Sequence, residues 1–212
     1  MASCQSTTYA LRARAPRLTK MLGDCDMPNE PNFEEMMPGA REGVRNSEPD
    51  AEKMALLAWL DEQRRHALDI LDGLDEEALR RPVLPSGWSC LGMVRHLAAL
   101  ERFWFRAVVS GEPMVGDGLG EDDDEWRVAP DVPAAAVFAA YREAAAFSDA
   151  VIAATPLDAP PTWWPEDLFG EWRLHSVREI ILHTMTETAS HAGHLDVVRE
   201  LIDGRLWLVL DG

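Results

Sequence analysis

The chain has 212 residues, of which 47% are hydrophobic and 27% charged, a balance that supports one globular domain with a full core. Its 20 basic and 37 acidic residues give a formal net charge of −17, which argues against broad binding to nucleic-acid phosphates and against docking on anionic lipid. No run approaches the ~20 apolar residues that cross a bilayer, and the three cysteines form no C-x-x-C pair. We therefore expect a soluble, cytoplasmic protein without a disulfide framework or a cysteine-based zinc site.

Residues 1–46 differ in composition from the rest of the chain. The first 23 positions hold four basic residues and no acid, and a polar, turn-rich stretch follows. An acid-free start can indicate a transit peptide, but no apolar h-region or sustained amphipathic period accompanies it. We expect residues 1–46 to be a disordered extension or the product of a mis-assigned start codon, and residues 47–212 to form the domain.

Apolar residues at three-to-four spacing predict four long helices, and no segment shows the alternation of a strand. Ser47 and Ser176 are predicted N-caps, and Gly204 is predicted to end the last helix. The predicted bounds are residues 47–73, 89–111, 131–154 and 176–202. The sequence therefore predicts an all-α four-helix bundle with long loops at 111–130 and 155–173.

The last helix carries ionisable side chains on the side that faces the core. At about 100° per residue, His183, His191 and His194 lie within about 40° of Glu187, and apolar Ile180 shares this arc. A bare carboxylate among imidazoles inside a bundle is costly unless it is paired or coordinated. Side chains four residues apart stand on adjacent turns, at a separation that suits one metal ion.

The second helix offers a third ligand, His96, at the margin of its buried face. The predicted metal set is His96, Glu187 and His191, with an open position for water or substrate. In the simpler alternative, Glu187 and His191 form an ion pair within their helix and His96 is a structural residue.

Two segments carry a family resemblance. SGWSCLGMVRHLAALERFWF, followed by ILHTMTETASHAGHLDVVRELIDG, resembles the DinB-like superfamily, in particular its branch of mini-circle proteins and mycothiol S-transferases, over about Met54 to Gly204. The resemblance implies a four-helix bundle that holds a divalent metal, with zinc the first expectation and nickel another, on one His of the second helix and two residues four apart in the last. The matching positions are His96, Glu187 and His191, although many relatives have His where this chain has Glu187.

The resemblance also implies an activity. Such relatives bind a low-molecular-weight thiol on the metal as its thiolate and then catalyse S-transfer to an electrophilic substrate, or isomerisation. A thiol with a pKa near 8.5 is only a few per cent thiolate at neutral pH, and metal coordination deprotonates it. His183 and His194 are the candidates for orienting a ligand or moving a proton.

Three further features lie near these residues in the sequence. Trp163 and Trp164, in the 155–173 loop, either line a substrate pocket or cap the core. Arg178, in the first turn of the last helix, is a further substrate-binding candidate and is expected to face an anion or an acidic partner. The acidic residues between Asp117 and Glu125 lack the order of a calcium loop and are expected to be solvated.

Two other functions stay open at this stage. The same three ligands could hold iron(II) for oxygen chemistry. The protein could also be a non-catalytic, stress-associated bundle whose metal is structural or absent. Homodimerisation through exposed helix faces is left open as well.

Overall fold

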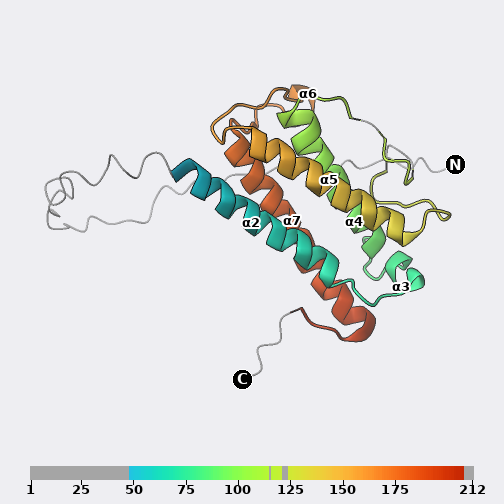
Figure 1. The fold of residues 1–212 in the computed structure, drawn as a ribbon. Helices are drawn as coiled ribbons and strands as arrows, with labels where there is room; N and C mark the ends of the chain where they lie inside the picture. Colours follow the sequence, from blue (N-terminus) through green and yellow to red (C-terminus); the bar gives the residue numbers. More distant parts are fainter. Residues whose placement is uncertain (1–47, 115, 121–123, 208–212) are drawn as a thin grey trace, which may run out of the picture. The chain divides into compact units, whose positions relative to one another are not determined.

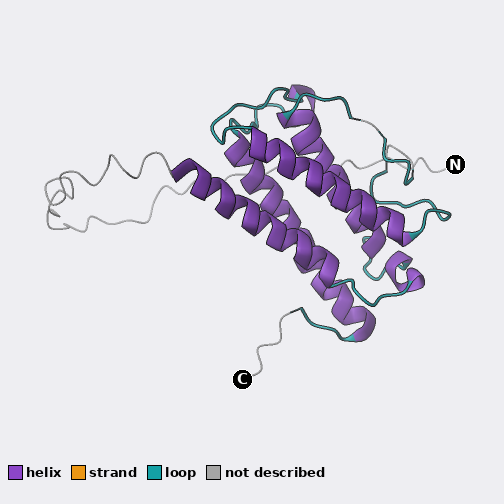
Figure 2. Cartoon of the chain, in the orientation of Figure 1, coloured by secondary structure: helices purple, strands orange, loops and turns teal. Residues whose placement is uncertain are grey.

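The structure, a computed structural model, describes residues 48–114, 116–120 and 124–207, and every regular element in these ranges is a helix (Figure 2). The prediction of an all-α fold is therefore confirmed. The predicted extension at residues 1–46 and the predicted Ser47 cap lie outside the described residues. Six α-helices and one π-helix are described: α2 (Glu48–Asp69), α3 (Glu76–Arg80), α4 (Cys90–Glu101), the π-helix η1 (Arg102–Val109), α5 (Ala134–Ala154), α6 (Glu166–Phe169) and α7 (Val177–Asp203).

The long helices form a bundle. Helix α2 packs along α7, and α5 packs along α4 and η1 (Figure 1). Helices α4 and α7 are also in contact, so the two elements that carry the predicted ligands are neighbours. None of the described helices is both long and apolar enough to cross a membrane.

The core is divided into two apolar clusters. One joins α3 and the adjoining halves of α4 and α5 to the end of α7, and the other joins η1 and the 155–173 loop to the start of α7. Between them lie buried polar side chains from four helices. These are Arg64, Glu101, Ser148, Thr184 and Thr188. The bundle therefore has a polar layer across its middle, at the level where α7 carries Glu187.

The second long helix differs from its prediction. A continuous helix over 89–111 was expected, whereas α4 ends at Glu101 and continues as η1. The Ser110 amide donates to the Phe105 carbonyl at 3.1 Å, five residues back, which is the spacing of a π-helix. Ala107, Val108 and Val109, at the end of η1, are buried, the last two in the second apolar cluster of the core.

The ends of α7 agree with the sequence pattern. The Ser176 hydroxyl accepts the Glu179 amide at 3.3 Å, and the Glu179 carboxylate accepts the His175 amide at 2.6 Å. Gly204 ends the helix with φ +80°, a conformation that glycine adopts without strain. Helix α3, capped by Asp75, was not predicted because five residues show no periodicity.

Candidate metal centre

Helices α4 and α7 bring two of the predicted ligands together. His96 Nε2 and His191 Nε2 lie 3.2 Å apart, and the two rings meet edge to face at 84°. Both side chains are mostly buried, with 14% of each exposed. Two side-chain atoms bound tetrahedrally to one zinc ion lie about 3.3 Å apart. The imidazole pair therefore has the spacing of two ligands of one ion.

Glu187 stands one turn before His191 on the same side of α7. Its Oε2 lies 3.8 Å from His191 Nε2, farther than two ligands of one zinc ion. Among the described residues, no group of three or more His, Cys, Asp or Glu side chains has an arrangement that could hold a metal ion. Glu187 is partly exposed, and its side chain would have to rotate toward the two imidazoles to complete a three-ligand set.

Burial keeps His191 uncharged. Desolvation, together with the positive charges that His96 and His194 carry when protonated, lowers the pKa of His191 to about 4, although the charge of Glu125 opposes this. His191 Nδ1 is buried and has no hydrogen-bond partner among the described atoms. A neutral imidazole presents a lone pair, which is the form that binds a metal ion.

The loop between η1 and α5 covers His96. The Trp126 ring stacks on the His96 ring, with centroids 3.9 Å apart and planes 13° apart. Glu125 Oε1 accepts a hydrogen bond from His96 Nδ1 at 2.7 Å. Neither residue was predicted to belong to the site, because no local pattern shows that a loop folds back over a helix.

The prediction that the acidic loop is merely solvated is wrong for Asp117. Only 6% of its side chain is exposed, and it accepts hydrogen bonds from Arg95 at 2.9 and 3.0 Å and from Arg102 at 3.0 Å. Arg95 also donates to the carbonyls of Asp124 (2.8 Å) and Arg127. Arg95 thus holds both ends of the segment that carries Glu125 and Trp126.

The other two histidines of α7 lie on either side of the Glu187–His191 pair. The ring centroid of His183 lies 4.9 Å from that of Trp104 and 5.4 Å from that of Trp172. Burial lowers the pKa of His183, although the charge of Glu187 opposes this. His194 is exposed, 5.7 Å from His191 between ring centroids.

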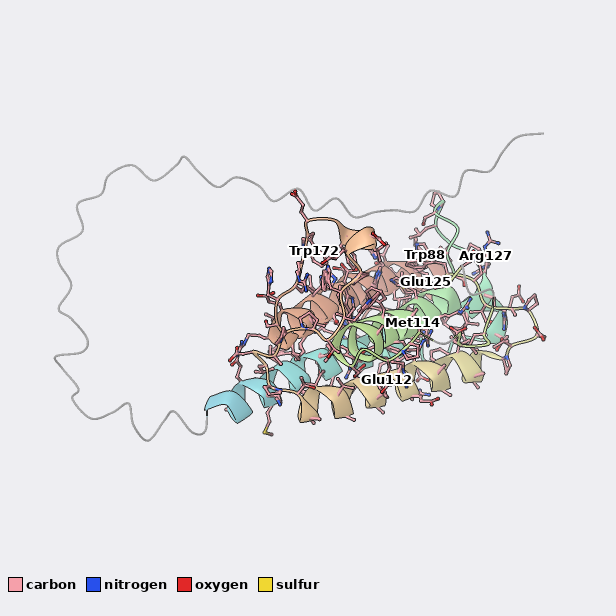
Figure 3. All side chains as sticks on the ribbon, turned by 90° about the horizontal axis from the view of Figure 1, so that it is seen from above. Trp88, Glu112, Met114, Glu125, Arg127 and Trp172 are labelled. Carbon is pink, nitrogen blue, oxygen red and sulfur yellow. The ribbon has the colours of Figure 1, made fainter. Side chains whose placement is uncertain are left out.

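The tryptophans of the 155–173 loop belong to one aromatic cluster. Trp164 is buried, with its ring centroid 5.9 Å from Trp104 and 5.8 Å from Trp172, so it caps the second apolar cluster of the core. Trp163 and Trp172 are exposed. Figure 3 shows Trp172 well apart from Glu125, so the aromatic cluster and the loop that covers His96 are separate features.

Arg178 is engaged by the chain's own acids. Its guanidinium donates to both oxygens of Glu52 at 2.6 and 3.1 Å and to Asp158. It therefore ties the start of α7 to α2 and to the preceding loop, and its expected contact with a substrate stays a prediction.

Comparison with known proteins assigns the family. The model of the family described as Mycothiol-S-transferase matches residues 55–204, well over half of the chain. No curated protein and no solved structure matches the chain. The matched region runs from α2 to the end of α7, so it includes His96, Glu187 and His191. The resemblance found in the sequence is thereby confirmed, and the chain belongs to the mycothiol S-transferase family.

Proposed function

We propose that this protein is a thiol S-transferase that activates mycothiol, or a similar small thiol, at a divalent metal held by His96, Glu187 and His191. The observation that carries the proposal is the imidazole pair, with Nε2 atoms 3.2 Å apart and the Glu187 carboxylate on the same side of α7. Membership of the mycothiol S-transferase family supports the choice of thiol.

The donor set suits zinc. Two neutral imidazoles and one carboxylate are a common catalytic set for this ion, and they leave a position that exchanges ligands. When bound there, such a metal would supply a thiolate at neutral pH. Iron(II) accepts the same set of ligands, so metal identity is part of the test.

The remaining residues are proposed to handle the proton and the second substrate. In the transfer, the sulfur forms a bond to an electrophilic carbon, and the leaving group departs with its electron pair. The thiol proton passes to His194, which is exposed and can return it to water. His183 lies beside Trp172, which in turn lies beside Trp164, and Trp163 belongs to the same aromatic cluster through Phe103. This end of the site is therefore proposed for the electrophile.

The first test is the metal content of wild-type protein beside His191→Ala. We expect about one zinc or nickel ion per chain in the wild type and almost none in the variant, because a single imidazole and a carboxylate bind weakly. His175→Ala is the matched control, since it removes an exposed histidine outside the set. Mass spectrometry of the metal gives the stoichiometry, and transfer of mycothiol to a fluorogenic alkylating electrophile gives the activity.

Each result of this test has a consequence. Metal retained in His191→Ala would show that the ligand set is wrong. If added thiol does not bind to the metal and the protein has no transfer activity, the non-catalytic alternative would be favoured. Iron with oxygen-dependent spectra would favour oxygen chemistry. A cytoplasmic location and a homodimer stay predictions that this test does not address.

A further inference from the structure

The hydrogen bond between Glu125 and His96 joins a carboxylate to a predicted metal ligand. His96 Nδ1 lies 2.7 Å from Glu125 Oε1, and Glu125 lies on the loop that passes over α4 and α7 (Figure 3). An ionised carboxylate can only accept a hydrogen bond, so the Nδ1 atom must carry a proton. A neutral imidazole has one ring proton, and this leaves Nε2 with a free lone pair.

We propose that Glu125 is a positioning residue that holds the proton of His96 on Nδ1 and thereby turns the Nε2 lone pair toward His191 and Glu187. The effect on metal binding rests on the function proposed above, whereas the effect on the His96 tautomer does not. In the opposite tautomer, an N–H group would occupy the direction in which His96 has to bind a metal. Metal-binding histidines commonly donate their second ring N–H to a carboxylate, which fixes both the tautomer and the ring orientation.

The loop holds Glu125 in place although its side chain is half exposed. Arg95, which is buried, donates to the carbonyls of the residues on both sides of the Glu125–Trp126 pair. The Asp124 carboxylate accepts the Trp126 amide at 3.1 Å. Trp126 stacks on the His96 ring and covers one of its faces. The backbone and one ring therefore set the position of the Glu125 carboxylate.

An ordinary surface ion pair would have a different effect. Exposed pairs of opposite charge contribute little to stability and leave the chemistry of other groups unchanged. Glu112 offers such a pair on the same stretch of chain, since it accepts from Arg106 at 3.1 Å and is 47% exposed, against 46% for Glu125. The two glutamates match in residue type and exposure, and only Glu125 contacts a predicted ligand.

The first measurement needs no metal. Nitrogen-15 NMR of the histidine rings at alkaline pH, where imidazoles are neutral, reports which nitrogen carries the proton. We expect His96 to be protonated on Nδ1 in the wild type and in Glu112→Ala, and to shift toward Nε2–H in Glu125→Ala. Glu125→Gln should retain much of the wild-type signal, because its amide oxygen still accepts the hydrogen bond.

The second measurement is zinc affinity, by competition with a chromogenic chelator. We expect Glu125→Ala to bind zinc about 10–100-fold more weakly than the wild type, Glu125→Gln to fall between them, and Glu112→Ala to equal the wild type. Thermal unfolding of the metal-free variants shows whether each is folded.

The proposal is overturned if His96 carries its proton on Nε2 in the wild type, or if Glu125→Ala binds zinc as tightly as Glu112→Ala. Failure of the proposed function looks different. A wild type that binds no zinc, but whose His96 tautomer still depends on Glu125, would remove the metal and leave the positioning role standing.

Discussion

At the scale of single residues, the polar layer across the bundle contains one buried ion pair, between Arg64 and Glu101. Arg64 Nε and Nη2 donate to the two Glu101 oxygens at 2.7 and 2.9 Å, and the two side chains are 4% and 1% exposed. Asp149, which is half exposed, accepts from Arg64 Nη1 at 2.7 Å. Burial alone would lower the pKa of Arg64, but the charges and hydrogen bonds of both acids raise it. The Arg64 guanidinium is therefore charged inside the bundle.

Replacing one partner of this pair should cost far more than replacing both. Glu101→Leu leaves a buried guanidinium, so we expect the free energy of unfolding to fall by about 3–5 kcal/mol. The double variant Arg64→Met/Glu101→Leu should recover most of this loss, because apolar side chains of similar size avoid the cost of desolvation. Urea denaturation measures both.

The control for this prediction is Asp149→Asn. It removes a half-exposed partner, and we expect a loss below about 1 kcal/mol. A double variant as unstable as Glu101→Leu would contradict the explanation, because it would show that packing at these positions matters more than charge.

Cys90 shows why a residue's place in a helix does not determine its reactivity. It stands in the first turn of α4, where the helix dipole can lower the pKa of a thiol. The structure buries it completely, and desolvation raises the pKa to about 11. Cys90 is therefore a packing residue.

At the scale of elements, the loop that carries Glu125 packs on α4 at a glycine. A Cβ atom on Gly92 would lie 2.0 Å from the Trp126 carbonyl oxygen, a distance that requires the loop to move. Ser89 caps the helix here by accepting the Gly92 amide at 3.1 Å. The glycine lets the loop come close enough for Trp126 to stack on His96.

Two glycine-to-alanine variants test this packing. Alanine normally stabilises a helix by about 0.5–1 kcal/mol relative to glycine. We expect that gain for Gly193→Ala in α7, where nothing lies within 4 Å of the added Cβ. Gly92→Ala should instead lower the free energy of unfolding, because the added Cβ would push the Trp126 backbone away from α4. Urea denaturation of both variants measures the two effects. Stabilisation by both substitutions would show that the loop does not depend on Gly92.

At the scale of the whole molecule, Asp117 links the long loop to α4 and η1 through Arg95 and Arg102. Burial alone would raise the pKa of Asp117, but the hydrogen bonds from Arg95 and the Leu119 amide, with the charges of both arginines, lower it overall. A carboxyl group with a lowered pKa in the folded state stabilises the protein above its unfolded pKa. This stabilisation is lost as the pH falls through the folded pKa.

Asp117→Asn should therefore change stability in a pH-dependent way. The free energy of unfolding of the wild type should exceed that of the variant most above about pH 5. The difference should shrink below about pH 4, where an unfolded aspartate becomes protonated. Urea denaturation of both proteins between neutral and acidic pH gives this difference directly. A difference independent of pH would mean that the Asp117 charge is not what holds the loop.

The outline of the fold follows from local physics, so the sequence alone determined it. Apolar spacing predicted the long helices, and side-chain and glycine caps predicted both ends of α7, because these signals act within a few residues. The arc of ionisable groups on α7 and the single histidine of the second helix likewise gave the residues of the candidate site.

Only the tertiary structure decided what those residues meet. His96 faces His191 across the bundle and donates to Glu125, which lies on a loop. Arg64 pairs with the buried Glu101 on another helix as well as with the half-exposed Asp149. None of these partners is set by spacing along the chain. Each depends on how helices pack and where a long loop returns, and close packing of the whole core determines both.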